Sequence, residues 1–166
     1  GSNHLEALAR VKTAVFDKTG TLTKGVFRVQ EATPAAGFSK EQLLCAAASA
    51  EQYSSHPIAQ SLRAAYGGQL PAAEDVDEEA GFGVSAVGDG RRVAAGNLRL
   101  MERLGVSCRE VEEAGTIVHV AVDGAYAGCV RIADEIKPEA KEAVAALKAE
   151  GVSKTVMLTG DAPRIG

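Results

Sequence analysis

The sequence predicts an α+β fold in which an antiparallel sheet, flanked by two helical hairpins, is inserted into a split α/β domain. Both ends of the chain combine strand patterns with polar, glycine-containing turns, and a helix pattern precedes the last strand. The middle of the chain instead alternates hairpin turns with pairs of helices. Such a change of pattern is typical of a domain inserted into another domain.

The first half of the chain is expected to contain two strands followed by two helices. The strand patterns cover residues 11–16 and 26–30. Ser39 and Gln42 form a capping box, which predicts a helix running to about residue 52. Pro57 suits the first position of a second helix, and this helix is expected to end before Gly67.

The second half is expected to contain two strand hairpins, a second helical hairpin, and a closing helix and strand. The Asp123-Gly124 pair is a strong hairpin signal. In chain order, the patterns cover a hairpin at 82–87 and 91–95, helices at 97–104 and 108–114, a hairpin at 116–122 and 125–132, a helix at 138–150 and a strand at 154–158.

Composition excludes several classes of protein. The 166 residues, of which 46% are hydrophobic and 24% charged, fit one ordinary folded domain or two small ones. No apolar run approaches the roughly 20 residues of a membrane helix, and no signal peptide is expected. A net charge of −4 without a basic cluster argues against nucleic-acid binding. The three separated cysteines favour free thiols in a reducing compartment.

Asp17 follows the first predicted strand and begins the segment Asp17-Lys18-Thr19-Gly20-Thr21-Leu22-Thr23. The carboxyl end of a buried strand is where open α/β sheets bind their ligands. Gly20 allows a tight turn, in which hydroxyl and backbone N–H groups can bind phosphate oxygens. A carboxylate placed there can attack a phosphoryl group and carry it as an aspartyl-phosphate. A strand end closed by an Asx turn is the plainer alternative.

The segment from Asp17 to Thr23 resembles the phosphorylation signature of the P-type ATPases, cation pumps whose aspartate is phosphorylated by ATP. Thr159-Gly160-Asp161 resembles their second phosphate-site motif, and Asp134-x-x-Lys137-Pro138 the segment by which the chain returns to the split domain. The resemblance implies a Rossmann-like, HAD-type phosphorylation domain and a partial Mg²⁺ site at Asp17 and the Thr19 backbone. The catalytic residues that it implies are Asp17, Lys18, Thr19, Thr159, Gly160 and Asp161.

Ser55-His56-Pro57, with Glu51 five residues earlier, narrows the resemblance to the heavy-metal-transporting P-type ATPases. The resemblance implies that Glu51 and His56 contact the adenine end of ATP. It completes the ATP pocket with Gly81, Gly83, Gly96 and Asn97. From the residues alone, His56 and Asn97 also fit helix N-caps. The Gly81-x-Gly83 pair is not a dinucleotide fingerprint, because Ala86 stands at its third glycine position.

The resemblance also implies the domain limits and the partners. Residues 1–30 and 133–166 are expected to form the two parts of the phosphorylation domain, and residues 31–132 the nucleotide-binding domain; Gly1-Ser2 is interpreted as a cloning remnant. No further lysine and no Gly-Asp-Gly-x-x-Asp-Asp-like segment follow Asp161, so the chain is expected to bind ATP or ADP with little turnover. We expect a soluble, monomeric fragment, the cytoplasmic part of a pump in a bacterial inner or plasma membrane. Its partners would be the membrane and actuator domains of that pump.

The transported metal and the class of reaction leave alternatives open. Residues 5–13 resemble the zinc/cadmium/lead branch more than the copper branch, which remains an alternative. A soluble aspartate-nucleophile phosphohydrolase would typically have an aspartate as general acid where this chain has Thr19. A nucleotide-binding module without chemistry is the third possibility. His119 is interpreted as a satisfied sheet residue, and the acidic run 74–79 as a solvated face.

Overall fold

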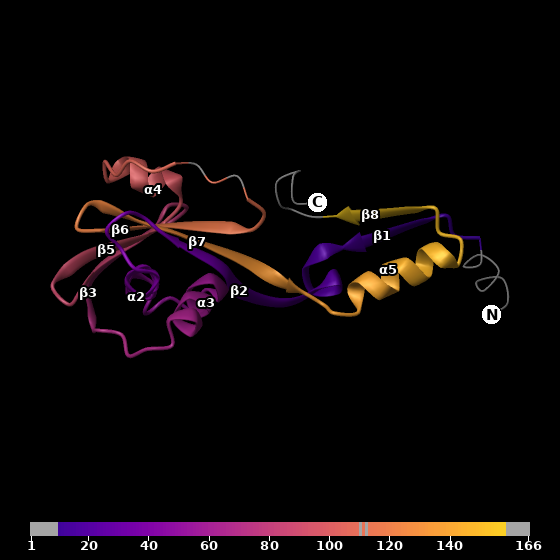
Figure 1. Cartoon of the computed structure of the whole chain (residues 1–166), viewed down its shortest axis with the longest axis horizontal. Helices are drawn as coiled ribbons and strands as arrows, with labels where there is room; N and C mark the ends of the chain where they lie inside the picture. Colours follow the sequence, from indigo (N-terminus) through magenta and orange to yellow (C-terminus); the bar gives the residue numbers. More distant parts are fainter. Residues whose placement is uncertain (1–9, 110, 112, 159–166) are drawn as a thin grey trace. The chain divides into compact units, whose positions relative to one another are not determined.

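The computed structural model describes residues 10–109, 111 and 113–158. The chain divides into two compact units. Unit 1 combines the N-terminal segment up to Val26 with the C-terminal segment from Asp134, and unit 2 contains Phe27–Ala133. The elements of each unit are labelled in Figure 1. No helix in the described part of the chain is long and apolar enough to cross a membrane.

Unit 1 contains a two-stranded parallel sheet. Strand β1 (Thr13–Asp17) pairs with β8 (Lys154–Leu158), and the register places Asp17 opposite Leu158. Both strands therefore end at the same edge. Helix α5 (Ala140–Ala149) precedes β8 and contains no buried residue. The expectation that Asp17 follows a buried strand is wrong for the described chain, because only β8 pairs with β1 and Val15 remains 56% exposed.

Unit 2 is built on a six-stranded sheet with the order β2-β7-β6-β5-β4-β3. The four neighbouring pairs from β7 to β3 are antiparallel. The strands are β2 (Thr23–Pro34), β3 (Ala73–Glu79), β4 (Gly83–Gly88), β5 (Arg91–Gly96), β6 (Thr116–Val122) and β7 (Ala125–Ile136).

Helices α2 (Lys40–Ala50) and α3 (Pro57–Tyr66) form the first predicted helical hairpin. Both halves of the expected capping box are present: the Ser39 hydroxyl accepts from the Gln42 N–H, and the Gln42 side chain accepts from the Ser39 N–H. Alanine makes up much of α2, and its small side chain lets the helix lie close to β4 and β5. The main core forms between these helices and the sheet.

Buried side chains lie on both faces of the sheet. Val93 and Ala95 of β5 belong to the core under α2 and α3, whereas Ala94 belongs to a second cluster with Leu100 and Met101. Successive side chains of a strand point to opposite faces. Helix α4 (Leu98–Arg103), which carries Leu100 and Met101, therefore covers the face opposite α2 and α3 (Figure 1).

The second predicted helical hairpin is wrong. Helix α4 forms, but the described residues between 106 and 115 are not helical. Val106 and Cys108 both pack into the cluster around Met101. Residues two positions apart face the same side only when the chain is extended. The packing of these two side chains therefore opposes the helix that the pattern at 108–114 predicted.

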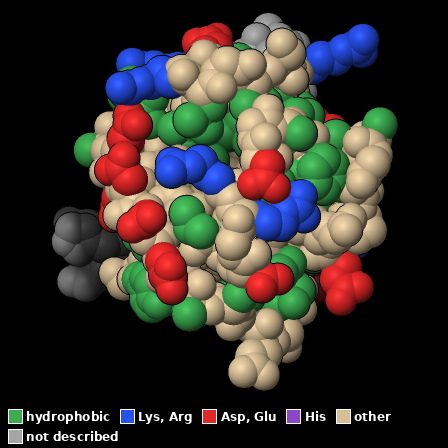
Figure 2. All heavy atoms as spheres, turned by 90° about the vertical axis from the view of Figure 1, so that its left-hand side faces the viewer, with side chains coloured by type: hydrophobic (Ala, Val, Ile, Leu, Met, Phe, Trp, Pro, Cys, Tyr) green, Lys and Arg blue, Asp and Glu red, His purple; other side chains and the backbone are tan. Residues whose placement is uncertain are grey.

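The acidic run 74–79 forms most of β3, at one edge of the sheet. Five successive residues of this strand are exposed. Its register shifts between Glu74 and Asp77, and Asp75 has a φ of +46°. Charge and bulges at an edge strand oppose pairing with another chain. Figure 2 shows a face on which acidic and basic side chains are interspersed with apolar ones.

Candidate functional site

A short loop follows β1, and Asp17, the last residue of that strand, is exposed. Lys18–Leu22 form one wide turn, closed by a hydrogen bond from the Thr23 N–H to the Lys18 carbonyl. Gly20 has a φ of +76° inside this turn. A Cβ at that position would meet nothing within 4 Å, so the glycine serves the backbone angle rather than close packing.

Thr23 ties this loop to the returning segment of the chain. Its hydroxyl lies 2.5 Å from Asp134 Oδ2, 3.2 Å from the Lys18 carbonyl and 3.1 Å from the Gly20 nitrogen. The Gly20 N–H donates to this oxygen, and the hydroxyl proton can be donated to Asp134. Thr23 is only 3% exposed. A buried threonine thus fixes the loop after Asp17 to a residue 111 positions later in the chain.

Lys137 makes a second connection between the same two segments. Its ammonium donates to the Gly20 carbonyl at 3.0 Å, and its backbone N–H donates to the Leu22 carbonyl at 3.0 Å. An ion pair of 2.7 Å joins Lys24 to Glu135 close by. The two motifs at 17–23 and 134–137 are therefore in contact. The predicted residues Thr159, Gly160 and Asp161 lie outside the described residues.

The predicted adenine-contacting pair lies at the corner between α2 and α3. Glu51 follows the last residue of α2, and His56 is the N-cap of α3. The Arg63 guanidinium donates to the Glu51 carbonyl at 2.5 Å and to the Ser54 carbonyl at 2.9 Å. Arg63 was not singled out from the sequence, and it fixes the loop that presents both predicted side chains.

His56 caps its helix through one ring nitrogen and leaves the other available. Nδ1 accepts from the Ile58 N–H at 3.2 Å, so the neutral ring carries its proton on Nε2. The cap role expected from the residues alone is therefore present. Because His56 is exposed, its Nε2–H can donate to a ligand without releasing the cap.

Glu51 is half-buried beside His56. Burial raises the pKa of the Glu51 carboxyl above its ordinary value. A hydrogen bond with the Ser54 side chain and the nearby His56 and Arg63 oppose this rise, whereas the Glu78 carboxylate adds to it. A carboxyl group that is partly desolvated in this way is typical of functional sites as well as of structural corners.

Gly83 and Gly96 face each other across β4 and β5. A Cβ on Gly83 would lie 2.3 Å from the Ala95 carbonyl oxygen, and one on Gly96 2.3 Å from the Phe82 carbonyl oxygen. Both glycines are therefore required for strands that approach too closely for any side chain. The sequence assigned both glycines to the ATP pocket by resemblance and did not predict this packing role.

Asn97 links Gly81 to the start of α4. Its side-chain oxygen accepts from the Leu100 N–H at 3.2 Å, and its amide donates to the Gly81 carbonyl at 2.8 Å. The N-cap role expected from the residues is thus present, and Asn97 also holds Gly81 in place. Gly81 has a φ of +78° with open space where a Cβ would stand.

The structure brings the predicted pocket residues together in two groups. Gly81, Gly83, Gly96 and Asn97 form one group, here called the glycine group, and Glu51 with His56 forms the other. Glu78 lies near both groups. Its charge acts on Glu51, and its register partner on β4 is Val84, the residue after Gly83. Arg99 and Arg103 stack over the Phe82 ring, 4.4 and 4.8 Å from its centroid, beside the glycine group.

Comparison with known proteins gives a consistent set of similarities. The model of a family described as haloacid dehalogenase-like hydrolase matches residues 11–165. A cadmium, zinc and cobalt-transporting ATPase of Bacillus subtilis is 56% identical over 100% of this chain and 24% of its own length. A zinc-transporting ATPase of Synechocystis is 52% identical over 97% of this chain and 23% of its own length.

A solved structure and a more distant relative complete the comparison. A zinc-transporting PIB-type ATPase in the E2·Pi state matches 97% of this chain and 28% of its own chain, with a TM-score of 0.79 and 35% identity. A copper-exporting P-type ATPase of Bacillus subtilis is 37% identical over 97% of this chain and 21% of its own length. The chain spans about a quarter of the length of the curated relatives that it matches.

Proposed function

This chain belongs to the haloacid dehalogenase-like hydrolase family, and on that premise we propose that it is the ATP-binding and phosphate-accepting part of a heavy-metal cation pump. The observation that carries this proposal is the contact of Thr23 and Gly20 with Asp134 and Lys137, which joins two motifs of such pumps around the exposed Asp17. Zinc or cadmium is the proposed class of cargo. The chain is 56% identical to a relative named for cadmium, zinc and cobalt, and 37% identical to one named for copper.

The proposed reaction is phosphoryl transfer to Asp17. An oxygen of the Asp17 carboxylate forms a bond to the terminal phosphorus of ATP, the bond from that phosphorus to the bridging oxygen breaks, and ADP leaves. Backbone N–H groups of the same loop are proposed to bind the transferred phosphate, other than that of Gly20, which is donated to the Thr23 hydroxyl. Lys18, Thr19 and the motif Thr159-Gly160-Asp161 are proposed to complete the catalytic set.

The donors for Mg²⁺ in this chain fit the ion in part. The carboxylate of Asp17 and the carbonyl of Thr19 are hard oxygen ligands, as Mg²⁺ prefers. Among the described residues no group of three or more His, Cys, Asp or Glu could hold a metal ion. When bound, Mg²⁺ neutralises charge on the transferred phosphate. With only part of this site, the chain alone is proposed to bind nucleotide with little turnover.

Unit 2 is proposed to hold the nucleotide. Glu51 and His56 would contact adenine from the corner of α2 and α3, and the glycine group would let the nucleotide approach the backbone. Residues 31–132, within unit 2, are the proposed nucleotide-binding domain. In the whole pump this part would face the cytoplasm, with the membrane and actuator domains as partners.

Titration of the 166-residue chain with ATP, followed by amide chemical shifts, tests the nucleotide pocket. We expect saturable changes at Glu51, His56, Gly81 and Gly83, and at least tenfold weaker binding for His56→Ala. His56→Asn is the matched control, because asparagine can still cap α3 while lacking Nε2. If His56→Asn binds ATP as well as the unchanged chain, His56 is only a cap and the proposed contact is wrong.

A further inference from the structure

Arg99 is a cation beside the glycine group whose charge is not paired with a carboxylate of the described chain. Its guanidinium carbon lies 4.4 Å from the centroid of the Phe82 ring, and Phe82 stands between Gly81 and Gly83. The Arg99 side chain is exposed. An arginine held over an aromatic ring keeps the N–H groups at the rim of its guanidinium available to bind an anion.

Arg103 lies over the same ring, but its charge already has a partner. Its guanidinium carbon is 4.8 Å from the ring centroid, and the guanidinium donates to the Glu79 carboxylate at the end of β3. Both arginines are exposed and come from α4, about one helical turn apart. The two residues therefore share a helix and a ring, and they differ in whether a carboxylate pairs with the charge.

The proposed position of the nucleotide requires a cation at this place. Glu51 and His56 are the proposed adenine contacts, so the ribose and the phosphates would extend from that corner toward the glycine group, the other part of the proposed pocket. Carboxylates are close to the glycines: Glu78 and Glu79 end β3, and Glu79 is the register partner of Gly83. A chain of phosphates beside these carboxylates is repelled unless an unpaired cation offsets their charge.

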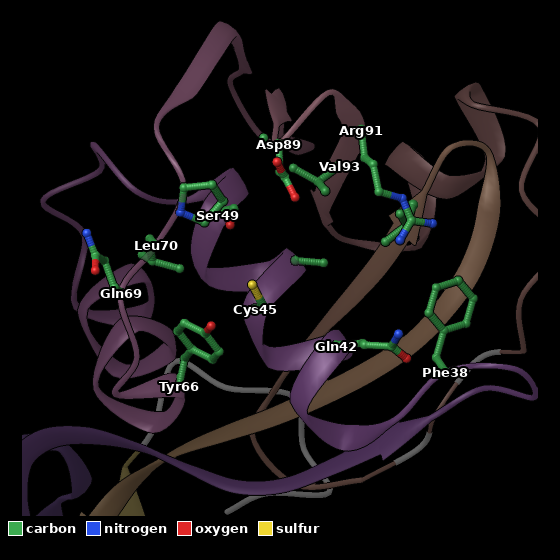
Figure 3. A pocket seen from close by; sticks show the side chains of 14 residues that line it. Phe38, Gln42, Cys45, Ser49, Tyr66, Gln69, Leu70, Asp89, Arg91 and Val93 are labelled. Carbon is green, nitrogen blue, oxygen red and sulfur yellow. The ribbon is translucent and has the colours of Figure 1, made fainter.

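The cavity in Figure 3 does not offer such a cation. It has a volume of about 520 Å³ and lies between α2, the segment after α3 and the turn from β4 to β5. The charged residues that line it in the described part of the chain are Asp89 and Arg91 (Figure 3), and Arg91 is paired with Asp123 at 2.8 Å. None of the six predicted nucleotide-binding residues lines this cavity. The phosphates are therefore not expected there.

We propose that Arg99 binds the phosphates of the nucleotide and thereby makes the site prefer ATP to adenosine. The guanidinium donates N–H groups to phosphate oxygens, as is typical of arginine, while the Phe82 ring holds it beside the glycine group. Arg99 is then a specificity-determining residue of the nucleotide site, an inference that rests on the proposed function.

Titration of the 166-residue chain with ATP and, separately, with adenosine measures this preference. We expect Arg99→Gln to weaken ATP binding by about tenfold, the value of one charge-assisted hydrogen bond, and to leave adenosine binding unchanged within about twofold. Arg99→Lys should keep most of the preference, because lysine retains the charge. The affinity of the unchanged chain for ATP should also fall more steeply with added NaCl than that of Arg99→Gln, because salt screens the charge that the variant lacks.

Arg103→Gln is the matched control, because it removes an equal charge from the same helix and the same ring. Equal weakening of ATP in the two glutamine variants would mean that only the net charge of this surface matters, and it would overturn the inference. Weaker adenosine binding in Arg99→Gln would also overturn it, because Arg99 would then act on the pocket as a whole. Unchanged binding of both ligands in Arg99→Gln would overturn the inference and leave the proposed function intact. If the unchanged chain binds neither ligand, the proposed function fails together with the inference.

Discussion

Thr23 shows how a single buried hydroxyl can hold a loop to a distant part of the chain. It binds the loop after Asp17 on one side and the Asp134 carboxylate on the other. The second oxygen of this carboxylate, Oδ1, is buried and has no partner among the described residues. The Asp134 carboxylate therefore depends on Thr23 for the hydrogen bond that offsets its burial.

Replacing Thr23 by valine should destabilise unit 1 by about 2 kcal/mol, because the apolar side chain keeps the shape of threonine but removes the hydrogen bond to Asp134 Oδ2. Amide hydrogen exchange of β1 and β8 measures this, since it reports each unit separately. Thr21→Val is the control at an exposed position of the same loop. Equal exchange rates in the two variants would contradict the role given to Thr23.

Gly83 should tolerate alanine far less well than Gly90. Both have positive φ angles, which cost about 1 kcal/mol for alanine, but only Gly83 would also press its Cβ against the Ala95 carbonyl oxygen. We expect a loss of about 3 kcal/mol or more for Gly83→Ala and about 1 kcal/mol for Gly90→Ala in urea unfolding. Equal losses would show that β4 and β5 can separate at this point.

The elements that the sequence predicted well have signals confined to a few neighbouring residues. The capping box at Ser39 and Gln42 acts within one turn, and Asp123-Gly124 forms the β6–β7 turn with Asp123 at a φ of +50°. The segment after α4 was predicted wrongly because its conformation depends on where Val106 and Cys108 pack. The helical spacing of the apolar residues in this segment does not show that they pack against the cluster around Met101.

His119 gives β6 a dependence on pH whose sign follows from its burial. It is 3% exposed, its Nδ1 lies 2.9 Å from the Tyr126 hydroxyl oxygen, and burial lowers the pKa of its imidazole below the ordinary 6.5. The unfolded chain therefore binds a proton at a higher pH than the folded chain does. The free energy of unfolding should fall as the pH drops below about 6.5, until the folded imidazole also titrates.

Comparison with His119→Gln isolates this contribution from the carboxylates that titrate in the same range. Glutamine can still hydrogen-bond to Tyr126 but does not titrate. Urea unfolding at pH 7.5, 6.5 and 5.5 should show a smaller loss of stability with falling pH in the variant. Parallel curves for the two proteins would mean that His119 is protonated as readily in the fold as in the unfolded chain.

At the scale of the whole molecule, the order of the motifs predicted which segments belong to the same domain, but not which residues connect them. The sequence indicated that residues 17–23 and 134–138 belong to one split domain, but not that Thr23 and Lys137 join them. Contacts between residues more than 100 positions apart depend on the complete fold. The packing role of Gly83 and Gly96 was missed for the same reason, since it depends on the register of two strands.

The limits of the nucleotide-binding domain provide a test of the whole arrangement. The sequence placed its start at residue 31, whereas unit 2 begins at Phe27. Phe27 and Val29 lie on β2 and pack against the main core. A chain of residues 27–133 should therefore be more stable than one of residues 31–132, by about 2 kcal/mol for the apolar surface of these two partly buried side chains.

Urea unfolding of the two shortened chains measures this difference, with Phe27→Ala in the longer chain as the matched control. The control should lose much of the added stability, because it removes the larger of the two packed side chains while keeping the strand. Both shortened chains should also retain ATP-induced shifts at His56 if unit 2 alone holds the nucleotide. Equal stability of the two chains would place the start of the domain at residue 31 or later and contradict the core contact of Phe27. Loss of the shifts from both folded chains would mean that unit 1 is needed for nucleotide binding.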